Sequence, residues 1–535
     1  MIDLIFDAET QLVSIDKSSF FTKVQTALAE GYFLRKRRRD IRRAKAGMSH
    51  LMKTEEDELE EAEIKEVQPA EVQTAPDEGE KEKHHQGGGL LAVLDDGIGY
   101  IARFFIMLRL PVVENRIVFS TFQNVYTCNC RYIAEEMRKR LEQEVAAKDA
   151  EAEKQKNEQA PVEENEKVKR TIEEEPYQLI FIVNRAVYAN KDQYDIPSDI
   201  WLVQRGSIAS FIALGTAKYW VDNALNCIWK NIRKKKRQIY LNTWHGSLGI
   251  KRLNGDKHWV RLAKKSNRKI SAFITNSTFE EEVFQDFAFW SRVPCLQFGH
   301  PRNDILLNEK YSIAMREKVY GYYRIPEHAK TVLYAPTFRD NKSDVSAIRI
   351  DCVRLKKAME IKFGGEWTVM VRAHMHNRHN VALRQMFNAP GVIDASDYND
   401  MQELLAVVDA GITDYSSWIF DFVLTGRPGF IYARDIDQYI HSRGFYYDLD
   451  KTPFSIASND DELVANIAAF DETEYAKNVQ AFLKEKGCYE QGNAAKQVAD
   501  MICDGTFEQK RAEAAARLKA KRKKQKEERR QKRSR

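Results

Sequence analysis

The sequence predicts an alternating α/β protein with two doubly wound domains. Short runs of β-branched and aromatic residues alternate with longer segments of helical periodicity, a pattern that favours parallel sheets with crossover helices. These runs form two groups, before and after about residue 301. The length of 535 residues allows a large buried core, and 43% hydrophobic residues exclude a wholly disordered chain.

The segments that precede the first group of runs do not resemble a folded core. Residues 1–33 are mixed in character and stay unassigned. Residues 34–90 are predicted to be a charged flexible linker, because a basic run is followed by an acidic stretch that buries too little apolar surface to offset chain entropy. Residues 98–110 (IGYIARFFIMLRL) fit either an interfacial amphipathic helix or a helix packed on the first domain.

The first domain is expected over residues 91–300, with a charged helical or disordered insertion at 141–176, and the second over residues 301–505. A basic, helix-prone tail follows at 506–535. The runs that we predict to be strands are residues 117–121, 179–183, 239–243 and 270–275 in the first domain and residues 332–334, 367–371, 391–393, 410–413 and 429–432 in the second.

The net charge of +5 is a sum over unequal parts. Residues 510–535 contain 14 Lys and Arg but 3 Asp and Glu, so the tail carries +11 and the remainder −6. Such a tail suits an anionic partner, either a membrane leaflet or the phosphates of a nucleic acid.

The cysteines and the hydropathy of the sequence indicate the cellular compartment in which the protein is expected. Seven scattered cysteines suit a reducing cytosol, and Cys128 and Cys130 have no second pair at zinc spacing. No secretory signal is visible at the start of the sequence, and the longest apolar stretch, residues 97–113, is interrupted by Arg103 and Arg109. We therefore expect no membrane-spanning segment.

Motifs at strand ends carry the functional information, because ligands of such sheets bind beyond the carboxyl ends of the strands. In AGITDYSSWIF, the predicted strand at 410–413 leads into Asp414, Ser416, Ser417 and, further on, Asp421. The two serines at a helix start suit an anion, while the alternative is that they only cap the helix.

A second motif, WTVMVRAHMHN, places Arg372 and His374 just past another strand. An arginine fork suits a phosphate, whereas His374, His376 and His379 could also be structural. No Cys or carboxylate at matching spacing accompanies these histidines, so we expect no metal site.

Three further motifs follow strands. His245 in NTWHG is a candidate general base, although a single histidine in this position can also be structural. Arg302 in GHPRND and Arg339 in YAPTFRD can reach an anion, and the Asn and Asp of GHPRND also suit helix capping. The sequence lacks a Gly-x-x-x-x-Gly-Lys-Ser/Thr phosphate loop and a Gly-x-Ser-x-Gly elbow. Arg, Ser and His at strand ends therefore indicate a phosphorylated or nucleotide-activated substrate.

Taken in order, the motifs NRIVFSTFQNVYTCNCRYIAEEM, YWVDNA, TWHG, GHPRND, YAPTFRD, RAH and DASDYNDMQELLAVVDAGITDYSSWIFDFVLTGRPGFIYARD resemble the CDP-glycerol glycerophosphotransferase family, the teichoic-acid polymerases and primases. The resemblance runs from about residue 115 to about residue 503, without the insertion. It implies a GT-B-like fold, in which two Rossmann-type domains face each other across a cleft.

The resemblance also implies a reaction and roles for the residues. Glycerol phosphate, or ribitol phosphate, would move from a CDP-alditol to a hydroxyl of a polyprenyl-linked polymer, releasing CMP. His245 would be the base, and His374 a second catalytic candidate. Donor phosphates would be bound by Arg372, Ser416, Ser417 and, as weaker candidates, Arg302 and Arg339, with Asp414 and Asp421 organising the loop.

The resemblance implies no resident cofactor and leaves a need for a divalent metal open. It places the enzyme on the cytoplasmic face of the membrane as a peripheral protein, which the basic tail would hold to anionic lipid. Ser247-Leu248-Gly249-Ile250 departs from the family's usual Thr-Pro-Leu-Lys, and Met375-His376 stands where Pro often follows Arg-x-His. The first departure leaves the acceptor open. The rival hypothesis is a nucleic-acid or ribosome-associated protein that binds through its tail.

Overall fold

The computed structural model describes residues 4–6, 13–15, 110–158, 177–227, 232–249, 252, 257–289, 291–337, 348–373, 385–442 and 444–534. Two compact units divide the chain. One comprises residues 1–93 and 167–175, and the other residues 94–166 and 176–535. In the first unit, strands β1 (Leu4–Phe6) and β2 (Val13–Ile15) pair antiparallel. The predicted linker at 34–90, the segment 98–109 and residues 159–176 of the insertion lie outside the described residues.

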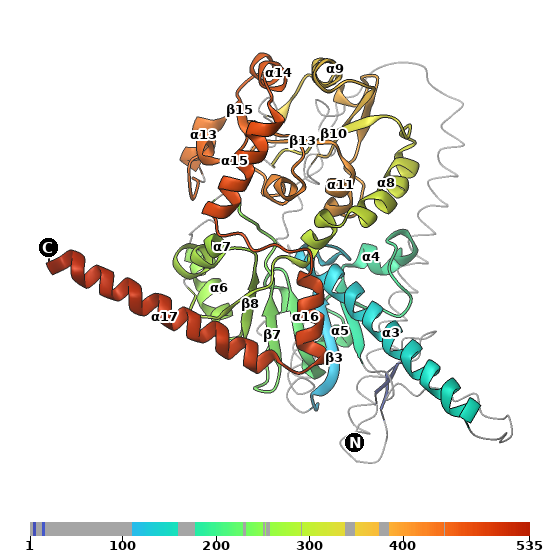
Figure 1. Ribbon diagram of the computed structural model, residues 1–535. Coiled ribbons are helices and arrows are strands. Elements are labelled where there is room, and N and C mark those ends of the chain that lie inside the picture. Colours follow the sequence, from blue (N-terminus) through green and yellow to red (C-terminus); the bar gives the residue numbers. More distant parts are fainter. Residues whose placement is uncertain are drawn as a thin grey trace, which may run out of the picture. The chain divides into compact units, whose positions relative to one another are not determined.

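The second unit holds two parallel sheets separated in sequence, which confirms the predicted α/β class (Figure 1). The first has the order β5-β4-β3-β6-β7-β8-β9. Its strands are β3 (Val113–Ser120), β4 (Gln178–Val183), β5 (Trp201–Gln204), β6 (Ala217–Asp222), β7 (Ile239–Asn242), β8 (Ala272–Thr275) and β9 (Cys295–Gln297). The second has the order β12-β11-β10-β13-β14-β15. Its strands are β10 (Lys330–Tyr334), β11 (Trp367–Val371), β12 (Val392–Asp394), β13 (Ala410–Thr413), β14 (Gly429–Tyr432) and β15 (Ser455–Ala457).

Each sheet is buried on both faces, as parallel sheets are. Ile117 and Phe119 of β3 belong to one core cluster of the first sheet, while Val118 belongs to the cluster on the other face. Helices connect the strands: α3 (Cys128–Glu158), α4 (Arg185–Ala189), α5 (Ile208–Thr216), α6 (Lys257–Asn267) and α7 (Thr278–Glu282) in the first half, and α8 (Glu309–Tyr323), α9 (Cys352–Phe363), α11 (Met401–Val407), α12 (Ile419–Phe422) and α13 (Ile436–Ser442) in the second. Helices α14 (Asp460–Ala468) and α15 (Glu472–Glu485) follow the last strand, β15.

The order of the strands reverses once in each sheet. The chain enters the first sheet at β3, adds β4 and β5 on one side, and then continues from β6 on the other side of β3. In the second sheet, β10 and β13 are neighbours in the same way. The loops that leave such neighbouring strands diverge, and they open a crevice at the carboxyl edge of the sheet.

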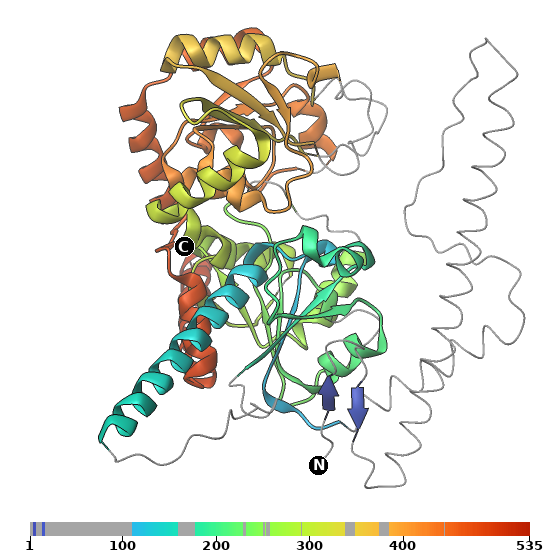
Figure 2. The ribbon, with the colours of Figure 1, turned by 90° about the vertical axis from the view of Figure 1, so that its right-hand side faces the viewer.

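The chain returns to the first sheet at its end. Helix α16 (Ala494–Cys503) lies beside α3, and its residues Val498 and Ile502 join the core cluster of Ile117 and Phe119 (Figure 2). Helix α17 (Phe507–Ser534) follows, and its Phe507 and Ala514 are buried in the same cluster. The basic tail therefore begins as part of the fold. The division of the chain near residue 301 stays a prediction.

Among the described residues, no helix is both long enough and apolar enough to cross a membrane.

Candidate active site

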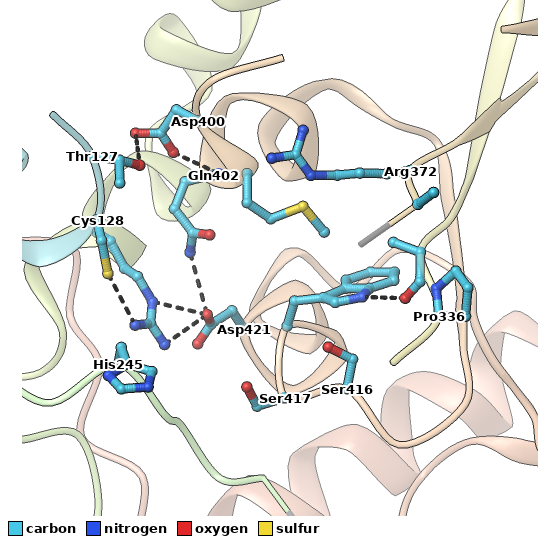
Figure 3. A pocket seen from close by; sticks show the side chains of 15 residues that line it. Thr127, Cys128, His245, Pro336, Arg372, Asp400, Gln402, Ser416, Ser417 and Asp421 are labelled. Atoms are coloured by element: carbon cyan, nitrogen blue, oxygen red, sulfur yellow. Dashed lines mark hydrogen bonds and ion pairs between the residues drawn. The ribbon is translucent and has the colours of Figure 1, made fainter. Parts of the chain in front are cut away.

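A pocket of about 270 Å³ opens where the two crevices meet (Figure 3). Its wall comes from loops that follow strands of both sheets. The lining residues are Thr127, Cys128, His245, Arg302, Ala335, Pro336, Arg372, Ala373, Asp400, Met401, Gln402, Ser416, Ser417, Trp418 and Asp421. Six predicted site residues thus meet in one place, although up to 176 positions separate them in the sequence, from His245 to Asp421.

His245 is presented by the loop after β7 in a defined tautomer. Its Nδ1 lies 2.7 Å from the backbone carbonyl oxygen of Asn223, which can only accept, so Nδ1 carries the proton and Nε2 is left as the acceptor. Burial lowers the pKa of His245 to about 4, the nearby Arg302 adds to the lowering, and the hydrogen bond to Asn223 opposes it. The imidazole is therefore neutral near pH 7, as a base must be.

The loop that supplies Asn223 is itself fixed by Asp222 at the end of β6. The Asp222 carboxylate is fully buried and accepts hydrogen bonds from the backbone N–H groups of Ala224 and Cys227, at 2.8 and 2.9 Å. It also accepts one from the Tyr240 hydroxyl at 2.9 Å. These contacts explain why the strand in YWVDNA ends at its Asp, because the Asp222 side chain shapes the turn that carries Asn223.

Arg302 and Asp421 form a buried ion pair between the two halves of the site (Figure 3). The guanidinium donates from Nε and Nη2 to one Asp421 oxygen at 3.0 and 2.9 Å, and from Nη2 to the carbonyl oxygen of Gly246 at 2.6 Å. Burial works against its charge, but Asp421 and Cys128 together outweigh burial and raise the pKa of Arg302. This arginine therefore ties the loop of His245 to Asp421 of α12.

Ser416 and Ser417 line the pocket half-buried, just before α12. The N-cap of that helix is Trp418, which makes no side-chain capping hydrogen bond. Neither serine is therefore the N-cap, which was the alternative role for them. Trp418 instead anchors the loop, because its Nε1 donates to the carbonyl oxygen of Ala335 at 2.9 Å. Asp414 lies behind the wall and accepts from the backbone N–H of Thr337 at 2.8 Å.

Arg372 follows β11 and reaches the same pocket. Its Nη1 donates to the carbonyl oxygens of Ala395 and Tyr398, at 2.9 and 2.6 Å. These two hydrogen bonds fix the orientation of the guanidinium. His374 and Arg339 lie outside the described residues, and their roles stay predictions.

Sequence reasoning missed several lining residues, chiefly Thr127, Asp400 and Gln402. Asp400 caps α11 by accepting from the backbone N–H of Gln402 at 2.8 Å, and it accepts from the Thr127 hydroxyl at 3.1 Å. It also pairs with Arg131 of α3 at 3.0 Å. An Asp followed three residues later by Glu403 does signal a helix start, but that pattern does not reveal a partner 269 residues away.

Comparison with known proteins agrees with this geometry. Residues 102–504 match the model of the CDP-glycerol:poly(glycerophosphate) glycerophosphotransferase family. A teichoic acid poly(glycerol phosphate) polymerase of Staphylococcus epidermidis is 30% identical over 336 residues, which are 59% of this chain and 45% of that protein. A polymerase with the same description from Bacillus spizizenii is 30% identical over 341 residues, 61% of this chain and 84% of that protein.

Among solved structures, a variant of the wall teichoic acid polymerase TagF superposes with a TM-score of 0.61 at 25% identity, covering 78% of this chain and 97% of that one. This likeness confirms the GT-B-like fold that the motifs implied. The chain spans less than half of the Staphylococcus epidermidis relative and most of the Bacillus spizizenii one.

Proposed function

The chain belongs to the CDP-glycerol:poly(glycerophosphate) glycerophosphotransferase family, and on that premise we propose that it transfers glycerol phosphate from CDP-glycerol to a hydroxyl of a polymer acceptor, releasing CMP. The observation that carries the proposal is the pocket, which combines a neutral histidine whose Nε2 can accept a proton with arginine and serine side chains suited to phosphate. The product would be a unit of a teichoic acid or a related cell-surface polymer.

The chemistry follows from these residue types. Nε2 of His245 accepts the proton of the acceptor hydroxyl as its oxygen attacks the phosphorus that bears the glycerol. A new P–O bond forms, the pyrophosphate P–O bond breaks, and its electron pair leaves on CMP. Arg372 offsets the charge of the phosphoryl oxygens, and the hydroxyls of Ser416 and Ser417 donate hydrogen bonds to them. Positioning and electrostatics supply most of the rate in such reactions.

Arg302 has a different task in this scheme from the donor contact that its motif implied. Its guanidinium already binds Asp421 and the carbonyl of Gly246. It therefore sets the distance between the base and residues 414–418, the loop before α12 that carries Ser416 and Ser417 and is called the donor loop below. His374 stays a second catalytic candidate, and Arg339 a further candidate for donor contact.

The test is to supply CDP-glycerol and CDP-ribitol separately, with a polyprenyl-linked acceptor, and to measure CMP release and product length. CMP release that depends on the acceptor supports the proposal, and the preferred donor identifies the alditol. A protein that releases no CMP from either donor but binds nucleic acid through its tail would favour the rival hypothesis.

We further propose that the enzyme works as a peripheral protein on the cytoplasmic face of the membrane, where a polyprenyl-linked acceptor is anchored. Each Lys or Arg near an anionic leaflet adds roughly 1 kcal/mol of attraction, which salt weakens. Binding to vesicles that contain anionic lipid, and its loss at high salt, tests this part of the proposal.

A further inference from the structure

One large apolar side chain beside the pocket has no role in the scheme above. Phe122 follows β3 at the point where the strand order of the first sheet reverses, and 52% of its surface is exposed. Its ring stacks on the imidazole of His245, with the centroids 5.0 Å apart and the planes at 22°. Trp244 stacks on the same imidazole, at 4.5 Å and 30°. The candidate base is thus held by two aromatic rings from different loops.

The backbone that carries Phe122 adopts a conformation that side chains disfavour. Gln123 and Asn124 have φ of 64° and 55°, in the left-handed region, although neither is glycine. Residues other than glycine rarely adopt this conformation, and it persists only where their surroundings fix it. Here Asn184 does so, because its backbone N–H donates to the carbonyl oxygen of Asn124 at 2.7 Å and its side chain donates to that of Gln123 at 3.1 Å.

A single buried residue connects Phe122 to the base. Asn223 is 1% exposed. Its side-chain oxygen accepts from the backbone N–H of Phe122 at 2.6 Å, while its backbone oxygen accepts from Nδ1 of His245 at 2.7 Å. Asp222 fixes the turn that carries Asn223. Asn223 therefore holds both the backbone of Phe122 and the imidazole of His245 in fixed positions. The strained loop and this shared anchor together favour a role in the site over a chance surface contact.

We propose that Phe122 is a positioning residue for the reaction, which stacks on His245 and holds its ring plane so that Nε2 faces the acceptor hydroxyl. This inference rests on the proposed role of His245 as the base. The single hydrogen bond at Nδ1 fixes one point of the ring but leaves it free to tilt about that bond, and stacking removes this freedom. The Phe122 ring also covers a face of the imidazole, which agrees with the effect of burial on its pKa.

The experiment compares Phe122→Leu with Phe122→Tyr, which keeps the stacking ring. Phe287→Leu is the matched control, because Phe287 is 53% exposed like Phe122 but its ring lies against Tyr446, at 5.7 Å between centroids, and not against His245. We expect Phe122→Leu to lower kcat for CMP release about ten- to a hundredfold with an unchanged KM for CDP-glycerol, since a small misplacement of a reacting group costs this much. Phe122→Tyr should restore most of the rate, and the control should behave as wild type. A Leu variant with wild-type kcat, or a Tyr variant as slow as the Leu variant, would overturn the inference.

A second readout does not depend on turnover. The imidazole of His245 is titrated by NMR, its signal identified by its absence from His245→Asn. Phe122→Leu should move its pKa from about 4 toward the ordinary value of about 6.5. An unchanged pKa together with an unchanged kcat refutes the stacking role, while full turnover by His245→Asn would remove the proposed base itself. Equal melting temperatures of the Leu variant and its Phe287 control exclude unfolding as the cause.

Discussion

At the scale of single residues, His245 shows how the environment prepares a group for its task. A histidine in water is half protonated near pH 6.5, and the protonated form cannot accept a proton. Burial lowers the pKa of His245 to about 4, so the neutral form dominates over the whole physiological range. In the proposed role of His245, the cost would be a weaker base, which a precisely held acceptor hydroxyl would offset through proximity.

We predict the pH dependence that follows. Because the neutral imidazole is the active form, kcat/KM should stay level from pH 8 down to about pH 5 and fall only as the pH approaches 4. His245→Asn should lower turnover by about 10²–10⁴-fold while donor affinity stays within a few-fold. His328→Asn serves as the control, because His328 is an exposed histidine paired with Glu366. An acid limb near pH 6.5 would contradict the burial of the ring.

The candidate residues illustrate what can be read before the fold is known. The strand-end position predicted that Arg372 and Ser416 would share a crevice, because the carboxyl ends of parallel strands in one sheet lie along one edge. That His245, which follows a strand of the other sheet, would face the same cleft was implied by the resemblance to the family. The partners of Arg302 could not be predicted in this way. Whether an arginine faces a phosphate or an aspartate depends on contacts across 119 positions of the sequence, and no local pattern encodes them.

At the scale of elements, the site consists of loops from two sheets in direct contact. A Cβ built on Gly249 would lie 2.9 Å from the Cβ of Ser417, so only glycine allows the loop after β7 to approach the donor loop this closely. Gly249 belongs to the segment in which this chain departs from the usual family pattern. The departure therefore falls where the base side and the donor side of the pocket meet.

We predict that Gly249→Ala displaces the donor loop. The clash should raise the KM for CDP-glycerol and cost about 1–3 kcal/mol of stability, as overpacking does. Gly321→Ala is the matched control, because that glycine lies within α8 with nothing within 4 Å of an added Cβ. It should stabilise the fold by about 0.5–1 kcal/mol and leave KM unchanged. Equal KM values for both variants would refute direct contact between the loops.

Helix α17 changes how the basic tail can be tested. Ala514 is buried, Arg517 donates to the carbonyl oxygen of Cys295 at 3.3 Å, and Lys521 pairs with Glu282 at 2.9 Å. Deletion of residues 510–535 would therefore uncover the core of the first sheet as well as remove charge. A shorter deletion, of residues 524–535, removes seven Lys and Arg and two Glu but none of these contacts.

We predict that the two deletions differ. The shorter one should keep the melting temperature and the turnover of a soluble acceptor, and weaken binding to vesicles with anionic lipid. The longer one should lower the melting temperature as well. Vesicle binding by co-sedimentation and thermal unfolding measure the two effects separately. Wild-type vesicle binding by the shorter chain would place the membrane contact elsewhere.

The elements missed by sequence reasoning share a physical cause. Nine predicted runs coincide with strands of the two parallel sheets, but β5, β6, β9 and β15 of these sheets were not predicted. Strands β9 and β15 are three residues long and lie at sheet edges, where short runs carry little periodicity. The strand β6 follows α5 without a break, so its AKYWVD segment continues an apolar helix in the sequence. Pairing with β3 and β7, which is non-local, decides its structure.

At the scale of the whole molecule, the last part of the chain joins elements of both halves. Glu490, between α15 and α16, accepts from the side chain of Asn303 at 2.8 Å and from the backbone N–H of His300 at 3.1 Å. Asn303 in turn donates to Asp421 of α12, the helix that follows the donor loop, at 3.1 Å. Burial raises the pKa of Glu490 to about 8, against the lowering effect of these hydrogen bonds. The folded protein therefore keeps a proton here that the unfolded chain releases near pH 4.5.

This proton makes the stability of the wild type depend on pH. Between about pH 4.5 and pH 8 the folded state binds more protons at Glu490 than the unfolded state, so the free energy of unfolding should fall as the pH rises through this window. Glu490→Gln is neutral at every pH and keeps an oxygen to accept from Asn303. We predict that the free energy of unfolding of the variant equals that of the wild type near pH 5 and exceeds it by a margin that grows toward pH 8. His300 is unchanged in both proteins, so its own titration cancels in the difference. Urea unfolding at pH 5, 6.5 and 8 measures this margin, and a margin that stays constant would show that Glu490 is ionised in the fold and that the junction is held by charge.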